Sequence, residues 1–539
     1  MTGTLDAARS AAPSRGAALV AAVILMLVLG GFMGVVCAVA LNDRTVGAHD
    51  LDRVAVTCAA EGATNVAVRA IEDAGRTFAP ITALRTGLAP VRGLLVPYTI
   101  TPVGTPFVGM SASGLASLYD GYVVSAVART QTAGATVTRT LVVASSSVFQ
   151  FGVFYDDDLE IFPGADFTFK GRIHTNGRLA IGADGFHSLT LDTDYVRAAG
   201  TVQRAPFDGR ASFTGPVNVL VKGTGTPGQG NGTYQPWSLG LADGGPGAAP
   251  APAFAADAQA QFKGTIASAS AGVTPLFVPS PESTAPGGFY DAKAIAGGLA
   301  IHDGVATLNG IGDPSLTAAG IVRSTTMNDA REGKVVRLTE IDLGKLAAAG
   351  KWPANGLIYA SLSSAAPGQP DAVRLVNGAQ LPSGLTVVTP DPLYVQGDFN
   401  TVAKQPAAAI ADAVNLLSNS WNATADSRPI GANPPPASDT TYNFSFAAGN
   451  TPTVGTAYNG GLENFPRFHE DWGGITCTYN GSMAELWRSK IATQPWGKPK
   501  VYGAPKRVWS FDADLLNPQR LPPFTPRAYR VATNVYTEQ

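Results

Sequence analysis

The stretch AALVAAVILMLVLGGFMGVVCAVAL, Ala17–Leu41, decides the architecture of this 539-residue chain. It carries no charged residue, and as an α-helix it would be about 37 Å long at ~1.5 Å per residue. A helix of that length crosses a hydrocarbon core of roughly 30 Å with some tilt, whereas the apolar core of a cleaved secretory signal is shorter. Arg9 and Arg15 outweigh Asp6 on its N-terminal side. We therefore expect a single pass of the inner (cytoplasmic) membrane, with the N-terminus in the cytoplasm and residues 42–539 outside it.

The composition of the chain predicts many short strands. Charged residues make up only 14%, while 61 glycines and 39 prolines supply turns. The formal net charge is −2 and Lys and Arg are scattered, so no nucleic-acid partner is indicated. No Cys/His cluster is present, and Asp156–Asp158 lacks the spacing of a calcium loop, so we expect neither metal nor cofactor. The predicted fold class is α+β, mainly β: a long N-terminal transmembrane helix followed by a large β-rich extracytoplasmic body, either a sandwich or a short β-solenoid.

The three cysteines are Cys37, Cys58 and Cys477. Cys37 lies inside the apolar stretch, where a cysteine acts as a small apolar residue. Cys58 and Cys477 could form one disulfide if both face an oxidising compartment, or they could lie too far apart.

The residues around the apolar stretch resemble the class III signal of type IV pilin-like proteins. A short basic leader ends at Gly16, the apolar helix begins at Ala17, and a polar helix continues it. The continuation, including His49–Arg53 and Ala59–Ala63, is similar to the N-terminal domain of PilX-type minor pilins. The resemblance implies cleavage between Gly16 and Ala17 by a prepilin peptidase, and contacts with other pilin-like subunits through the helix. A plain membrane anchor is the alternative.

One position departs from the pattern of major pilins. They carry a glutamate at the fifth mature position, which here is Ala21. PilX-type and GspK-type minor subunits also tend to lack it, because a buried carboxylate is unnecessary where no neighbouring amine pairs with it. Ala21 therefore favours a minor or initiating subunit.

The body after the helix alternates between strand-like and linker-like segments. Residues 122–129 and 136–143 flank a turn at Gly134 and predict a β-hairpin. From 149 to 202, short apolar pulses recur between single glycines, which is typical of a small β-solenoid or a tight meander. The expected divisions are a leader (1–16), the transmembrane (17–41) and extracytoplasmic (42–76) halves of the helix, a β-rich region (91–206), a Gly/Pro/Ala-rich linker or insertion (207–290), a second β-rich region (291–424) with a helix near 407–421, a Pro-rich linker (425–440) and a C-terminal region (441–539).

The segment Gly171–Gly177, GRIHTNG, resembles a glycine-flanked motif of large pilin-like proteins. Its His174 and Asn176 are candidate ligand-binding residues, since His and Asn can serve acid–base or oxyanion chemistry. No nucleophile or carboxylate partner stands at a diagnostic spacing. The favoured interpretation is a turn with positive φ at Asn176-Gly177.

The segment GGLENFPRFHEDW, 460–472, resembles the C-terminal region of the same PilX-headed proteins. Adjacent polar residues cannot all point into one pocket, so we expect its aromatic residues to anchor a helical turn while the charges bridge to nearby Lys and Arg. Four residues remain candidates for ligand binding: Glu463, His469, Glu470 and Asp471.

These features together predict a non-enzymatic minor or tip component of a type IV pilus-like assembly, in adhesion or pilus biogenesis at the cell surface. Two alternatives remain open. One is a pseudopilin of a type II secretion system. The other is a membrane-anchored enzyme that acts on surface polysaccharide, since β-solenoids often bind glycans.

Overall fold

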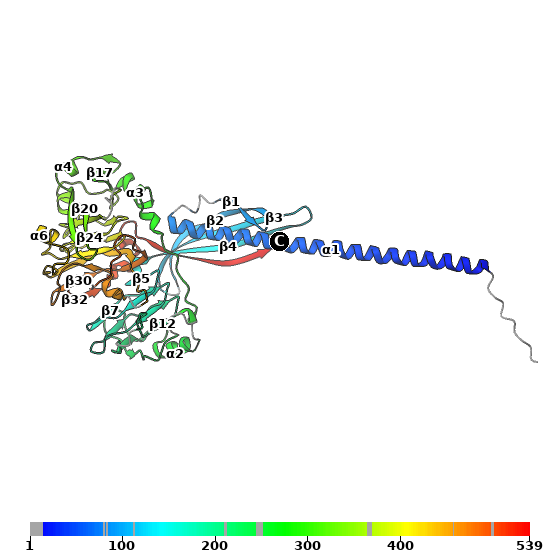
Figure 1. Ribbon diagram of the computed structural model, residues 1–539, viewed down its shortest axis with the longest axis horizontal. Helices are drawn as coiled ribbons and strands as arrows, with labels where there is room; N and C mark the ends of the chain where they lie inside the picture. The colour runs from blue at the N-terminus through cyan, green and yellow to red at the C-terminus, as the bar shows by residue number, and fades with distance from the viewer. Residues whose placement is uncertain are drawn as a thin grey trace, which may run out of the picture.

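The computed structural model describes residues 15–78, 81, 85–111, 114–209, 213–243, 252–363, 369–455, 458–496 and 501–538. One long helix, a small antiparallel sheet packed on it, and a large β-solenoid make up the molecule (Figure 1). The predicted α+β, mainly β class is confirmed. The expected leader up to Ser14 and the glycine-proline run at 244–251 lie outside the described residues.

Helix α1, Arg15–Thr77, runs without a break through the apolar stretch and its polar continuation. Its apolar half is exposed, and among the described residues it is the one helix long and apolar enough to cross a membrane. The C-terminal half instead buries a stripe at helical spacing, which small alanine side chains dominate. The stripe consists of Val56, Ala59, Ala60, Ala63, Ala67 and Ile71.

Five antiparallel strands pack against that stripe, in the order β1-β2-β3-β4-β33; we call them the stem sheet. The predicted hairpin is present, with Val123 opposite Thr140. The fifth strand comes from the end of the chain, so the solenoid is inserted between the fourth and fifth strands of the sheet. The bounds are β1 (Thr86–Val91), β2 (Leu94–Met110), β3 (Ala116–Arg129), β4 (Gly134–Ser147) and β33 (Arg527–Glu538).

The inserted residues, 148–526, form a three-faced parallel β-solenoid that we call the head. Its first coils fall where the recurring apolar pulses predicted a solenoid. Equivalent positions stack in register, as Val153, Ile173 and Val196 do on the first face. The first coil holds β5 (Val153–Tyr155), β6 (Leu159–Ile161) and β7 (Phe167–Lys170), the second β8 (Ile173–Thr175), β9 (Leu179–Ile181) and β10 (Leu189–Asp192), and the third β11 (Val196–Ala198), β12 (Val202–Gln203) and β13 (Val217–Leu220).

After the third coil the chain crosses to the opposite end of the head. From there the coils of the second half follow one another back to the middle of the head. The last strand that this second half adds to the first face, β31, pairs in parallel with β5, where Met483 is opposite Val153. A single sheet of twelve strands therefore runs along the whole first face. The strands that this half adds to the first face are β16 (Leu299–His302), β21 (Leu357–Ser361), β23 (Leu385–Val388), β25 (Ala407–Ala411), β28 (Ser445–Asn450) and β31 (Met483–Arg488).

The other two faces are assembled the same way. The second carries the hairpin of β19 (Val322–Asp329) and β20 (Lys334–Asp342), then β22 (Asp371–Val376), β24 (Leu393–Gln396), β26 (Val414–Leu417) and β29 (Arg467–Phe468). The third carries β27 (Thr440–Asn443), β30 (Thr476–Asn480) and β32 (Lys506–Ser510). Helices α3 (Phe289–Gly297) and α6 (Ala423–Asp426) lie outside the coils.

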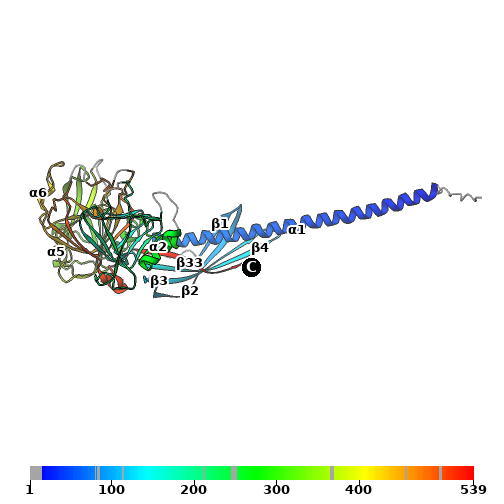
Figure 2. The same cartoon turned by 90° about the horizontal axis from the view of Figure 1, so that it is seen from below.

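Both ends of the solenoid are covered. At one end, beyond β14 (Tyr234–Pro236) and β15 (Ile266–Ala267), α2 (Pro252–Phe262) packs Phe254 and Phe262 into the core. At the other lie β17 (Val305–Leu308), β18 (Ile311–Gly312), α4 (Ser315–Ala318) and α5 (Leu343–Ala348). Covered ends protect sheet edges from pairing with other chains. The axis between them is transverse to α1 and lies at the C-terminal end of that helix in Figure 1, and Figure 2 looks along this axis.

Two expectations are corrected. The helix predicted near 407–421 is instead β25 and β26, because this run is buried on all sides and an apolar run without alternation does not distinguish strand from helix. The segment 207–290 is not a linker between domains. Its described residues supply β13, β14, α2 and β15, so they belong to the solenoid and its cap.

Candidate functional site

The two candidate residues of GRIHTNG, His174 and Asn176, lie near the junction of the stem sheet and the head. The His174 ring is 2% exposed and stacks on Phe154, with centroids 5.4 Å apart. Burial lowers the pKa of His174 to about 4, so the imidazole is neutral at pH 7. Its Nε2 lies 3.2 Å from Asn176 Oδ1.

Asn176 forms hydrogen bonds with the backbone of a neighbouring segment at Leu276 and does not lie in a turn with positive φ. Its side-chain amide donates to the Leu276 carbonyl at 2.6 Å, and its Oδ1 accepts from the Leu276 amide at 2.8 Å. Neither Asn176 nor Gly177 has positive φ, which corrects the expected turn. Glycine is needed at 177 because an added Cβ would lie 2.6 Å from the backbone of Asp157.

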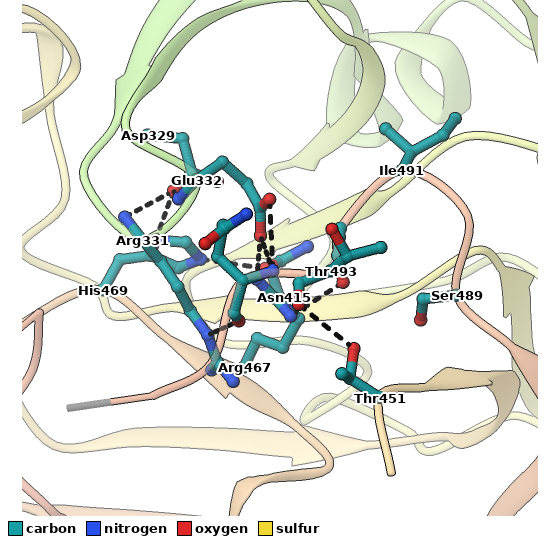
Figure 3. Close-up of polar contacts among 12 residues, drawn as sticks. Asp329, Arg331, Glu332, Asn415, Thr451, Arg467, His469, Ser489, Ile491 and Thr493 are labelled. Atoms are coloured by element: carbon teal, nitrogen blue, oxygen red, sulfur yellow. Dashed lines mark hydrogen bonds and ion pairs between the residues drawn. The ribbon is translucent and has the colours of Figure 1, made fainter. Parts of the chain in front are cut away.

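His469 belongs to a buried polar network in the head (Figure 3). Its Nε2 lies 2.8 Å from Asn415 Oδ1, and its Nδ1 lies 3.6 Å from Asp329 Oδ1. Burial lowers the pKa of His469 to about 4. Asp329 also accepts the Tyr394 hydroxyl, and it accepts the backbone N–H of Glu332 at 2.9 Å.

The same network contains a buried ion pair. Arg467 on β29 pairs with Glu332 in the β19–β20 turn, and the two side chains are 6% and 5% exposed. Arg467 also donates to the Ala492 carbonyl at 2.9 Å. These contacts fix the hairpin turn to the second face of the head.

The network offers no room for a substrate. The cavity beside His469 holds about 10 Å³, roughly the minimum for one water molecule. The polar side chains of this buried cluster therefore take one another as hydrogen-bond partners, and the cluster stabilises the fold. Its members include Asp329, His469 and Asn415.

The remaining candidates of the 460–472 segment do not converge. Glu470 is buried, accepts the Ser418 amide at 2.6 Å, and burial raises its pKa to about 7. Glu463 is buried in the short 3₁₀ turn Gly461–Asn464, and burial raises its pKa to about 7 as well. Asp471 is exposed at the surface. Phe465, Phe468 and Trp472 are buried, but Phe468 lies on β29, so the expected helical turn is corrected to the short turn Gly461–Asn464 followed by a strand.

The disulfide considered between Cys58 and Cys477 is not formed. Both cysteines are free: Cys58 is half-buried on α1, and Cys477 is buried on β30 inside the head. They belong to separate parts of the molecule, which corrects the pairing.

A cleft that the sequence did not predict lies beside His174. It measures about 530 Å³, and we call it the junction cleft. Its floor is the face of the stem sheet that points away from α1, and its walls are β8, β11 and residues 272–276. Arg197 on β11 is the register partner of His174 on β8. The repeat of one coil in the sequence is therefore the signal that connects the two positions. The lining includes Ser117, Tyr119, Ala144, Ser146 and Arg530 from the sheet, and His174, Tyr195 and Arg197 from the head.

No protein-family model and no curated protein matches the chain. Among solved structures, the chain is similar to the competence-associated pilin ComZ from Thermus thermophilus, with 12% sequence identity over 90% of this chain and 97% of that chain. The TM-score is 0.28, which does not establish a common fold.

Proposed function

We propose that this chain is a non-enzymatic minor or tip subunit of a type IV pilus-like assembly. In this proposal α1 is anchored in the cytoplasmic membrane, a prepilin peptidase cleaves between Gly16 and Ala17, and the head is presented outside the cell for adhesion or assembly. Residues 1–14 of the expected leader lie outside the described residues, and Arg15 and Gly16 begin α1. The sequence resemblance around Gly16 supports this part of the proposal.

One structural observation supports the proposal most strongly: the two halves of α1 have opposite surroundings. The first half exposes a continuous apolar surface, with Leu27 70% exposed. The second half is the core on which the stem sheet folds. A fully apolar, exposed helix is stable only in lipid or among other apolar helices, and an assembly subunit exchanges one environment for the other.

The head favours a minor or tip position over a repeating one. Ten parallel strands stack along its first face, so nine spacings of ~4.8 Å give a head about 43 Å long across α1. The helix is only about 10 Å wide. A transverse head of this size at every position of a tightly packed filament would collide with its neighbours.

The alternatives rest on fewer observations. A pseudopilin of a type II secretion system would have the same stem, and the experiment below separates it by the fraction in which the chain is found. The polysaccharide-acting enzyme gains no support from the junction cleft, because no Asp or Glu is among the described residues that line it.

Shearing of surface filaments tests the proposal. We expect the full-length chain, detected by an antibody, in the filament fraction of wild-type cells and not in that of cells lacking the assembly ATPase. A chain that remains in the membrane fraction of both strains would contradict the pilus role and favour a pseudopilin or a plain anchor.

A matched pair of variants links the result to the apolar half of α1. Leu27→Arg places a charge in the middle of the apolar stretch, whereas Leu51→Arg places it on the polar half, where the side chain is 74% exposed. We expect Leu27→Arg to be lost from membranes and filaments and Leu51→Arg to behave as wild type. Equal behaviour of the two variants would contradict the assigned role of the apolar half.

A further inference from the structure

The floor of the junction cleft is hollow because small side chains meet there in register. Ser117, Ser146 and Ala528 form one row across β3, β4 and β33, and the next row contains Ala144 between Tyr119 and Arg530. The stem sheet meets the head at the waist of the molecule (Figure 1), and residues of the head line the cleft beside this floor. The volume of about 530 Å³ lies within the ~300–1,000 Å³ of small-molecule sites.

The described lining of the cleft holds two arginines and no acidic residue, and Asp194, outside the lining, is close enough to Arg197 to interact with it electrostatically. The two arginines are Arg197 and Arg530, and neither forms an ion pair within the described part of the chain. The Arg197 guanidinium stacks over Tyr195, 4.6 Å from the ring centroid, and donates to backbone carbonyls of Thr265 and Gly264. Arg530 is exposed on the floor. Guanidinium groups with no carboxylate partner are the usual receptors for a ligand carboxylate.

His174, which lines the cleft, has a buried ring nitrogen that no protein group satisfies. His174 Nδ1 has no hydrogen-bond partner, although the ring is 2% exposed. The imidazole is neutral, and when Nε2–H donates to Asn176 Oδ1 the Nδ1 atom is left as an acceptor. An acceptor at this position suits a ligand hydroxyl and does not suit a carboxylate.

The aromatic rings supply the third element of recognition. Tyr119 and Tyr195 both line the cleft, one from the stem sheet and one from the head. Tyrosine combines an apolar face with a polar tip, which suits a ring that carries both C–H and O–H groups.

We propose that the junction cleft binds a small acidic sugar, a uronic acid or a short oligosaccharide that contains one. The carboxylate is recognised by Arg530 with Arg197 adding positive charge, a ring hydroxyl donates to His174 Nδ1, and the sugar ring lies against the tyrosines. This site is independent of the proposed pilus role, since it rests on the cleft alone.

Calorimetric titration of the detergent-solubilised full chain tests the site with three probes: sodium D-glucuronate, D-glucose and sodium acetate. We expect glucuronate to bind about tenfold or more tightly than glucose, which lacks the carboxylate, and than acetate, which lacks the ring. Equal binding of acetate would overturn the sugar, equal binding of glucose would overturn the acid, and no binding of glucuronate would overturn the site.

Two arginine variants of the same sheet provide the matched comparison. We expect Arg530→Gln to weaken glucuronate binding about tenfold or more, and Arg129→Gln, an exposed residue outside the cleft, to leave it unchanged. Thermal unfolding of both variants verifies that the stem sheet is intact. An Arg530→Gln protein that folds and binds as wild type would overturn the proposal.

Discussion

Glu485 is a buried carboxylate whose protonation affects the stability of the head. Its Oε2 accepts the backbone N–H groups of Asp156 and Asp157, at 2.8 and 3.0 Å, and so ties β31 to the turn after β5. Burial raises the pKa of Glu485 from an ordinary 4.5 to about 8. The folded state therefore keeps a proton that the unfolded chain has already released between these two pH values. The contribution of the Glu485 carboxyl group to the free energy of unfolding is complete below pH 4.5 and is lost as the pH rises through 8.

Glu485→Gln is predicted to flatten the pH dependence of stability. Between pH 6 and 8 the free energy of unfolding of the wild type falls by up to ~1.4 kcal/mol per pH unit through this group, and the glutamine variant lacks that component. Urea unfolding at several pH values measures it. Glu282→Gln is the control, since Glu282 is exposed and its pKa lies below the ordinary value. Parallel pH profiles for wild type and Glu485→Gln would contradict the assignment.

The Arg467–Glu332 pair makes a second prediction at this scale. Glu332→Gln leaves the buried guanidinium without its counter-charge, and we expect a loss of about 3–5 kcal/mol in the free energy of unfolding. Asp514→Asn, which breaks the exposed Arg520–Asp514 pair, is expected to cost less than about 1 kcal/mol. Denaturant unfolding measures the loss in the free energy of unfolding for both variants. Equal losses would contradict the prediction that the buried pair contributes more than the exposed pair.

The sequence could predict where polar residues are concentrated along the chain, but it could not predict which distant residues they contact. Arg467 and Glu332 are 135 positions apart, and the turn that carries Glu332 meets β29 only because the coils stack. His469 lies beside Asn415 and Asp329, and neither of these residues has a local signal in the sequence that connects it to His469. The junction cleft depends in the same way on a contact between the stem sheet and the head.

At the scale of elements, the solenoid needs closed ends. The last coil at one end presents β15 as an edge, and α2 covers it by inserting Phe254 and Phe262 into the core. An uncovered edge of this kind pairs with other chains.

Phe262→Asp is predicted to open this end. Removal of a fully buried aromatic ring costs about 3–5 kcal/mol, and the exposed edge adds self-association. Ala256→Asp, on the exposed side of the same helix, is the control. Thermal unfolding and size-exclusion chromatography measure the two effects. A Phe262→Asp protein that stays monomeric and as stable as the control would show that α2 is not a cap.

Local patterns predicted some elements and missed others for physical reasons. The hairpin of β3 and β4 alternates apolar and polar residues because one face packs on α1 and the other does not. The strands β25 and β26 are buried on all sides, so their sequence has no alternation and does not distinguish a strand from a helix. Single glycines between apolar pulses indicated a solenoid, although they do not encode the order of its coils.

At the scale of the whole molecule, the first coil of the solenoid lies at the middle of the head and not at one of its ends. One half winds from β5 toward α2, and the other half begins at the far end and returns to β31 beside β5. The last strand, β33, then closes the stem sheet. Both connections between stem and head therefore lie at the centre of the head, which holds it across α1 as a single transverse body (Figure 1).

The central claim is that α1 is the stem of an assembly subunit, and the mass of the mature N-terminus tests it most directly. We predict that protein extracted from membranes begins at Ala17, with a free or methylated amine, and that it keeps residues 1–16 in cells without the prepilin peptidase. A mature protein that retains Met1 in peptidase-containing cells would contradict the account and leave α1 as a plain membrane anchor.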